Sequence, residues 1–391
     1  MSIKFSLFTL LALAGGMGCG DDDVAVDAGV GADDVGVGAD DVGADADDDA
    51  AADVFDAGDI FDAGNDAAFD GGFTRLEGDV SHPMDDVLRL NHLQMEGTHN
   101  SYHQRPRSVF GEGEIPAAFD YEFDPLDVQL EEQGVRKFEI DVHYDVTRGR
   151  WNVLHIALAD PDSSCETFQE CMSVIRTWSD AHPGHHPIFV QVEPKTRIPD
   201  GDAGIAQYDA LDREIRQVFG EDLLITPGFV QGDAETLQGA VTTTGWPTLG
   251  ETRGRTAFFL NCARSDCIRY GNLDDRAAFA DGNEDDPWTA VRVMNNPNNG
   301  VREAVEAGYI VRTRAADNEQ VVAGDEAVLM ESVATALASG AHMISTDLPA
   351  PIPSLTYFVQ FPGGSPSLCN PVTAPEGCTA TDIEDPARIT P

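Results

Sequence analysis

The sequence predicts an α/β fold built as a single barrel of parallel strands. From about Phe73 to the C-terminus, short runs rich in apolar residues alternate with helical patterns. Strand-then-helix repetition implies parallel strands, and roughly 320 residues is a usual size for one α/β barrel with insertions. Polar residues directly follow several of the apolar runs, at the strand ends where such a barrel carries its functional groups.

Seven apolar runs are expected to form strands. They are short, and polar residues or turn signals follow them. In chain order they cover residues 93–95, 135–142, 153–154, 188–192, 256–261, 309–313 and 342–346.

Helical patterns lie between these runs, at residues 166–181, 205–219 and 325–339. Within 325–339 the apolar residues recur at helical spacing. Residues 268–300 are rich in Asp, Asn and Gly with little periodicity, and we predict a long surface loop there.

The N-terminus is typical of an export signal. Lys4 precedes ten mostly apolar residues, 5–14, which are too few to span a bilayer as a mature helix. Residues 1–19 are therefore predicted to be a signal peptide that ends in a bacterial lipoprotein site, with Cys19 lipidated and the chain anchored to the cell envelope. The residues at 16–18, Gly-Met-Gly, depart from the usual lipobox, and simple secretion is the alternative.

Residues 20–72 contain 18 aspartates and no Lys or Arg. Such a segment repels itself and buries little, so it is predicted to be a disordered tether. No window has EF-hand spacing with its closing Glu, which argues against a calcium loop. The folded domain is expected at 73–391.

The charge of the folded part excludes one class of function. Without the tether's 18 aspartates and Lys4, the formal charge of −45 becomes −28 for residues 73–391. A domain this acidic is not expected to bind nucleic acid, nor to adhere to anionic lipid by charge alone.

Six of the seven cysteines fall in close pairs, and Cys19 stands apart. Of the fifteen possible connectivities, local pairing is the simplest in an exported chain. Zinc is the alternative, but the pairs lack the C-x₂-C spacing of common structural zinc sites. The predicted disulfides are Cys165–Cys171, Cys262–Cys267 and Cys369–Cys378.

Two carboxylates on one strand face suggest a cation site. Glu139 and Asp141 are two residues apart, so their side chains point the same way, and burying both is very costly without a cation. Asn100 and Glu193 add oxygen ligands if the strand ends converge, a set that suits Ca²⁺ or Mg²⁺. The alternative is pairing with basic neighbours, namely Arg136, Lys137 or Lys195.

Two histidines are candidate proton shuttles. Cleavage of a phosphodiester by a hydroxyl needs a base for the nucleophile and an acid for the leaving oxygen, and His99 and His155 can supply them. His143 remains undecided between a supporting role at the metal and a place in the core. The others considered are expected to be exposed or structural: His92, His103, His182, His185 and His186.

Five segments together resemble one enzyme family. They are GTHNSYH (97–103), GVRKFEIDVHYD (134–145), NVLH (152–155), PIFVQVEPK (187–195) and MISTDLP (343–349). In this order they are similar to the calcium-dependent phosphoinositide-specific phospholipase C family, in its bacterial single-domain branch, over about residues 85–385. The resemblance implies a distorted TIM (β/α)8 barrel that cleaves phosphatidylinositol to diacylglycerol and inositol phosphate through a cyclic phosphodiester.

The resemblance also implies roles for residues. His99 would be the general base for the inositol 2-hydroxyl or would hold the phosphate, and His155 would protonate the diacylglycerol oxygen. Asp347 would orient a catalytic histidine or cap a helix. The Ca²⁺ ligands would be Asn100, Glu139, Asp141 and Glu193, and the contacts to phosphate or head group Lys195, Arg312 and Arg314.

The family pattern carries further expectations. The chain shows none of the accessory modules of the eukaryotic enzymes, so regulation through them is not expected. The acidic cluster argues against the metal-independent bacterial branch, which has an arginine in place of the cation. The expected partner is a phospholipid at a membrane surface. The protein itself is expected to be a monomer.

Two alternatives stay open. Glycerophosphodiester phosphodiesterases also carry Glu-x-Asp and two histidines on such a barrel, but Arg-Gly typically follows their first histidine, whereas Asn100 follows His99 here. A surface lipoprotein could instead keep the barrel only to bind lipid. It would be expected to have lost a ligand or a histidine, and none is lost.

Overall fold

The structure is a computed structural model that describes residues 82–106, 115 and 119–389. The predictions for the signal peptide, the tether and Cys19 lie outside the described residues. Within the described part of the chain, no helix combines the length and apolar character needed to cross a membrane.

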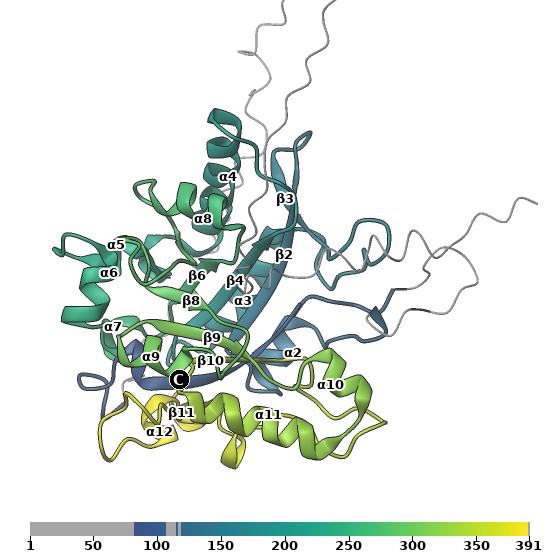
Figure 1. Ribbon diagram of the computed structural model, residues 1–391, viewed down its shortest axis with the longest axis vertical. Helices are drawn as coiled ribbons and strands as arrows, with labels where there is room; N and C mark the ends of the chain where they lie inside the picture. The colour runs from purple at the N-terminus through teal and green to yellow at the C-terminus, as the bar shows by residue number, and fades with distance from the viewer. Residues whose placement is uncertain (1–81, 107–114, 116–118, 390–391) are drawn as a thin grey trace, which may run out of the picture. The chain divides into compact units, whose positions relative to one another are not determined.

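The sheet is a curled, open barrel of parallel strands, which confirms the predicted fold class. Its ring runs in the spatial order β7-β6-β4-β2-β1-β10-β9-β8, and each neighbouring pair is parallel. Helices cover the outside of the curled sheet (Figure 1). The strands of the ring are β1 (Leu93–Thr98), β2 (Lys137–Asp145), β4 (Ile188–Pro194), β6 (Thr256–Leu260), β7 (Ala278–Ala280), β8 (Val291–Val293), β9 (Ile310–Arg314) and β10 (Met343–Thr346).

The ring is open between β7 and β8. Among the described residues no backbone ladder joins these two strands. Instead, the Oδ1 of Asp281, just after β7, accepts a hydrogen bond from the backbone N–H of Val293 at 2.9 Å. A side chain thus bridges this seam. On the other side of β7 the ring is continuous, and the short β5 (Leu224–Ile225) also pairs with β6.

One predicted strand has another place in the sheet than a parallel ring implies, and one predicted loop was wrong. The run at 153–154 belongs to β3 (Arg150–Val153), which pairs antiparallel with β2 as the second arm of a hairpin and is not a ring strand. Figure 1 shows this hairpin extending past the neighbouring strands. The predicted loop at 268–300 contains the end of a helix and two ring strands, β7 and β8. These strands have three residues each, which is too short to show a period in the sequence.

Several helices start at a residue whose side chain caps the first turn. At α3 (Phe168–Ala181) the Thr167 hydroxyl accepts from the Glu170 backbone N–H, and the Glu170 carboxylate accepts from the Thr167 N–H. The other described α-helices are α2 (Leu126–Glu131), α4 (Asp202–Phe219), α5 (Pro227–Gln231), α6 (Leu237–Gly239), α7 (Leu249–Thr252), α8 (Arg264–Gly271), α9 (Val301–Glu306), α10 (Asn318–Ala323), α11 (Glu326–Ser339), α12 (Ala380–Ile383) and α13 (Pro386–Ile389).

Strand β2 shows how the fold places polar groups inside the ring. Its even-numbered residues from 138 to 142 are fully buried apolar side chains that pack with the helix layer outside the sheet. Its odd-numbered residues face the interior, where Glu139 contacts Arg312 from β9 on the far side of β1 and β10. The period of two along a strand separates the core from the site.

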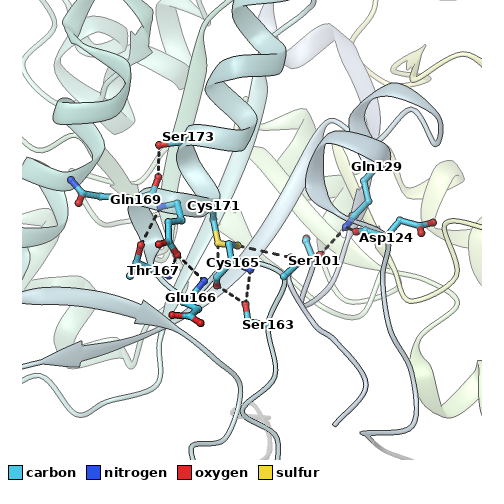
Figure 2. Close-up of a disulfide and its surroundings, with 12 residues drawn as sticks. Ser101, Asp124, Gln129, Ser163, Cys165, Glu166, Thr167, Gln169, Cys171 and Ser173 are labelled. Carbon is cyan, nitrogen blue, oxygen red and sulfur yellow. Dashed lines mark hydrogen bonds between the residues drawn. A yellow bond between two sulfur atoms is a disulfide. The ribbon is translucent and has the colours of Figure 1, made fainter. Parts of the chain in front are cut away.

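The three predicted disulfides are confirmed. Cys165–Cys171, Cys262–Cys267 and Cys369–Cys378 form with Cα separations of 5.3, 5.6 and 6.1 Å. Figure 2 shows the first, which joins the loop after β3 to the first turn of α3. The third follows β11 (Ser367–Cys369), which pairs antiparallel with β1. Local pairing therefore fixes the loops after β3, β6 and β11.

A buried network holds the C-terminal segment against the start of β4. The Arg136 guanidinium pairs with Glu384 at 2.5 Å, and the Glu384 Oε2 accepts from the His186 backbone N–H at 3.0 Å. Each of His185 and His186 has one ring nitrogen on a backbone carbonyl and the other on a serine hydroxyl. Burial lowers the pKa of His185 to about 4 and that of His186 to about 3, so both rings are neutral in the folded protein.

We expect acid to destabilise the protein through these two histidines. Their folded pKa lies below the unfolded value of 6.5, so the unfolded chain binds more protons as the pH falls below 6.5. Between pH 7 and 4.5 each neutral histidine should remove about 2–3 kcal/mol from the free energy of unfolding. Urea unfolding across this range measures the loss. His185→Asn keeps a donor to the backbone and should show a smaller loss. Equal pH dependence in both proteins would mean that His185 is protonated when folded.

Candidate active site

The residues predicted at strand ends are brought together at the carboxyl edge of the barrel. His99 and Asp347, from the loops after β1 and β10, contact each other. Glu139 in β2 lies 3.7 Å from His99, and Lys195 after β4 lies 3.3 Å from Asp141. Residues spread over 248 positions of sequence therefore share one site.

His99 is oriented by a carboxylate. Its Nδ1 lies 2.9 Å from Asp347 Oδ1 and 3.2 Å from the Arg314 guanidinium, while its Nε2 lies on the side of Glu139. Asp347 Oδ2 also accepts the backbone N–H of Asn318 at 2.8 Å, in the first turn of α10. Of the two alternatives for Asp347, the contact with a histidine is realised, whereas the N-cap residue of α10 is Asp317. Burial and Arg314 lower the pKa of His99, which leaves a neutral ring at pH 7.

Three carboxylates form a cluster that fits a cation. One oxygen from each of Glu139, Asp141 and Glu193 lies within 4.8 Å of the others. Both oxygens of Asp141 are buried and, among the described residues, lack a hydrogen bond of ordinary geometry. A buried carboxylate in that state is costly unless a cation or a proton neutralises it. Oxygen ligands on a hard cation such as Ca²⁺ match this set.

The alternative of pairing with basic neighbours is also realised, beside the cluster. Glu139 Oε2 accepts from Lys137 at 2.9 Å and from Arg312 at 2.6 Å. Although burial opposes it, these two cations hold the pKa of Glu139 well below its usual range. Burial raises the pKa of Asp141 well above its usual range, and Lys195 opposes this only in part. Before a cation binds, the basic partners of Glu139 thus favour its charged form, whereas burial favours the neutral form of Asp141.

Asn100 is held next to this cluster by a tight turn. Its backbone is left-handed, at φ 50°, which Asn tolerates better than most residues. The backbone N–H of the following residue, Ser101, donates to the backbone oxygen of Glu139 at 2.9 Å. The Ser101 hydroxyl accepts from the backbone N–H of Glu139 at 2.8 Å. The Asn100 amide donates to the Tyr121 hydroxyl at 3.1 Å, and its amide oxygen remains as a neutral ligand of the kind that Ca²⁺ accepts.

His155 has a carboxylate partner that the sequence did not reveal. Its Nδ1 lies 2.7 Å from Asp160 Oδ2, and the same carboxylate lies 2.9 Å from His103 Nε2. Of the two expectations for His103, exposed or structural, the second fits, since His103 is fully buried against Asp160. His143 lies beside them, with its Nε2 on the backbone oxygen of His155 and its Nδ1 on Thr196.

The candidate substrate-binding cations are tied to the acidic residues. Lys195 contacts both Glu193 and Asp141, and Arg314 contacts Asp347 at 3.3 Å. Arg312 is only 2% exposed and donates to Ser345 at 3.0 Å as well as to Glu139, so it lies within the interior of the ring.

Two asparagines at strand ends also escaped the sequence analysis. Asn261 after β6 donates to Glu193 Oε2 at 2.8 Å, and Asn295 after β8 accepts from Arg312. Asn261 lies one residue beyond β6, and Asn295 lies two residues beyond β8. A correct assignment of β8 as a strand would have marked Asn295 as a strand-end residue.

Comparison with known proteins agrees with this geometry. The family model described as Phosphoinositide phospholipase C, Ca²⁺-dependent, matches residues 88–152 and 150–371. No curated protein sequence matches the chain. Two solved bacterial structures share the fold. The calcium-dependent phosphoinositol-specific phospholipase C of Pseudomonas sp. is 17% identical, with a TM-score of 0.53 over 74% of this chain and 98% of that one.

The second is the Ca²⁺-dependent phosphatidylinositol-specific phospholipase C of Streptomyces antibioticus. It is 21% identical, with a TM-score of 0.50, over 66% of this chain and 95% of that one. At these identities the likeness shows the fold, and the family model shows the family. The chain therefore belongs to the Ca²⁺-dependent phosphoinositide phospholipase C family and is a phosphodiester-cleaving enzyme with Ca²⁺ as its cofactor.

Proposed function

We propose that this enzyme cleaves phosphatidylinositol, or a closely related phospholipid, to diacylglycerol and inositol phosphate through a cyclic phosphodiester. One observation carries the proposal. Two histidines, each bound through Nδ1 to its own buried carboxylate, share a barrel edge with a three-carboxylate cluster. A base, an acid and a cation site are what this reaction needs.

The histidines would move the protons. Neutral His99 takes the proton of the inositol 2-hydroxyl at Nε2 as that oxygen bonds to phosphorus. His155 gives its Nε2 proton to the diacylglycerol oxygen as the bond from phosphorus to that oxygen breaks. Hydrolysis of the cyclic product by water reverses the two roles, because His155 is then the base and His99 the acid.

Asn100, Glu139, Asp141 and Glu193 would hold Ca²⁺, which supplies positive charge to the phosphate oxygens and lowers the pKa of the attacking hydroxyl. Lys195 would leave the carboxylates once they bind the cation and would then contact the phosphate. Arg314, half-buried beside His99, would contact the head group. For Arg312, the contact with Glu139 supports a role in fixing that carboxylate in place.

The place of action is also part of the proposal. The N-terminal sequence supports export, with Cys19 carrying lipid or, failing that, release of the chain as a secreted monomer. A tether of the length of residues 20–72 would let the domain reach lipid at a membrane surface. A mass increase confined to the N-terminal peptide of the exported protein, and lost in Cys19→Ala, tests the lipid anchor.

The reaction is tested with the purified exported chain and phosphatidylinositol vesicles, in Ca²⁺ and then in excess chelator, with phosphorus NMR of the products. We expect cyclic or monophosphorylated inositol only with Ca²⁺. Release of glycerol 3-phosphate from glycerophosphodiesters, without turnover of phosphatidylinositol, would instead place the chain with the glycerophosphodiester phosphodiesterases. Binding to the vesicles without any product would favour the lipid-binding lipoprotein.

A further inference from the structure

A second histidine stands behind the His155–Asp160 pair. The Asp160 carboxylate has no exposed surface and receives His155 Nδ1 at 2.7 Å and His103 Nε2 at 2.9 Å. His103 is likewise fully buried, and its Nδ1 has no partner among the described residues. A His103 ring that carries a proton on Nε2 therefore donates to Asp160 and satisfies the geometry.

Asp160 has two imidazole partners that favour its charged form. Burial alone would raise its pKa, but the hydrogen bonds from His103 and His155 outweigh burial and hold the pKa of Asp160 below its usual range. A charged Asp160 accepts the Nδ1 proton of His155, which fixes the ring and leaves Nε2 as the group that exchanges a proton with substrate. The two imidazoles thus have different tasks on one carboxylate.

The loop that carries Asp160 is fastened to the segment after β1. Ser164 N donates to Tyr102 O at 2.9 Å, and Gln104 N donates to Asp162 O at 3.3 Å. The Cys165–Cys171 disulfide holds the far end of the loop to α3, with Ser101 nearby in Figure 2. These contacts keep Asp160 in reach of His103.

Aromatic rings complete the enclosure. Tyr121 stacks on His103 with ring centres 3.9 Å apart and planes 13° apart, and its hydroxyl accepts from Asn100. Phe119 meets His155 edge to face at 5.9 Å. The ring of His103 therefore cannot turn away from Asp160 without displacing Tyr121.

We propose that Asp160 is the positioning residue for His155 and that His103 holds Asp160 in place. This rests on the proposed function, in which His155 protonates the leaving oxygen. As the bond from phosphorus to that oxygen breaks, the Nε2 proton moves to it, and the imidazole that remains keeps its Nδ1 proton on Asp160. Neither Asp160 nor His103 exchanges a proton with substrate.

The leaving group separates positioning of an acid from general loss of structure. A diacylglycerol alkoxide is a poor leaving group and needs a proton, whereas p-nitrophenolate leaves without one. For Asp160→Asn we expect kcat on phosphatidylinositol to fall about 10²- to 10⁴-fold with KM nearly unchanged, since a mispositioned histidine loses most of its effect. On the p-nitrophenyl ester of inositol phosphate we expect a loss of no more than about threefold, because no acid is needed.

Matched variants of the full chain complete the test. His103→Phe keeps a ring for Tyr121 but removes the donor, and it should reproduce the selective loss. His103→Gln can still donate to Asp160 and should restore much of the rate on lipid. Glu166→Gln removes an exposed charge from the same loop and should change neither substrate's rate. If Asp160→Asn does not fold, the two variants His103→Phe and His103→Gln still test the proposal.

Each outcome decides one statement. Selective loss on the lipid in Asp160→Asn and His103→Phe, with Gln restoring the rate, supports the proposal. Equal losses on both substrates, or no effect, overturn it. His155→Ala is the reference: if it also loses both substrates equally, the acid role of His155 in the proposed function fails. If the wild-type enzyme cleaves neither substrate, the proposed function itself fails.

Discussion

Asp141→Asn should abolish Ca²⁺-dependent turnover without weakening the metal-free fold. Asp141 is fully buried, and burial raises the pKa of its carboxyl well above its usual range, which favours the neutral acid in the metal-free protein relative to the unfolded chain. An asparagine has nearly the shape of that neutral acid. It cannot supply the negative charge that the cation needs, and we expect Ca²⁺ affinity to fall by about 100-fold or more.

The melting temperature gives a readout that does not depend on turnover. A cation that binds only the folded state stabilises it, so Ca²⁺ should raise the Tm of the wild-type protein and leave that of Asp141→Asn unchanged. In chelator the two proteins should melt alike. A Ca²⁺-dependent rise in Tm that survives in Asp141→Asn would remove Asp141 from the ligand set.

Glu139→Gln is the contrasting variant in the same cluster. Glu139 balances Lys137 and Arg312, both of which are buried. Removing its charge leaves the buried Arg312 guanidinium without its carboxylate, and breaking a buried pair in this way typically costs about 3–5 kcal/mol. We therefore expect Glu139→Gln to lose stability even in chelator. Comparison of the two variants therefore distinguishes Asp141, which is expected to act only as a cation ligand, from Glu139, which also stabilises the fold.

Two of the ring strands that the sequence predicted share one property. In β2 and β4 an apolar run ends in charged residues, so the same few positions signal both a strand and a site. The short strands β7 and β8 lack such a run, and their flanking Asp and Asn residues read as loop. Asn295 was missed for that reason. It can be recognised as a strand-end residue only if β8 is known to end at Val293.

Contacts between loops were beyond reach of the sequence. Asp160 is five residues after His155 in a stretch with several acidic residues, and nothing local distinguishes it from Asp162. Only the folded loop shows that Asp160 is the buried one. Likewise, His103 belongs to the motif around His99, but the motif does not show what His103 contacts. Its partner, Asp160, lies 57 residues further along the chain. Pairing across such distances is a property of packing.

His99→Ala is expected to lower kcat by about 10²- to 10⁴-fold, the usual contribution of a general base. Unlike Asp141→Asn, it removes no proposed ligand, so Ca²⁺ should still raise the Tm as in the wild-type protein. His92→Ala is the matched control. It removes a half-buried imidazole just before β1, at the opposite end of the strand from His99, and should leave kcat unchanged.

His99→Ala and Asp141→Asn together separate proton transfer from Ca²⁺ binding at this edge of the barrel. If His99 moves a proton, its loss should reduce kcat while the Ca²⁺ concentration for half-maximal activity stays close to the wild-type value. Asp347→Asn should follow in the same direction, since it removes the carboxylate on His99 Nδ1 and leaves the cluster intact. An activity of His99→Ala that matches the wild type would mean that another group takes the inositol proton, and would leave His99 as a ligand of the phosphate.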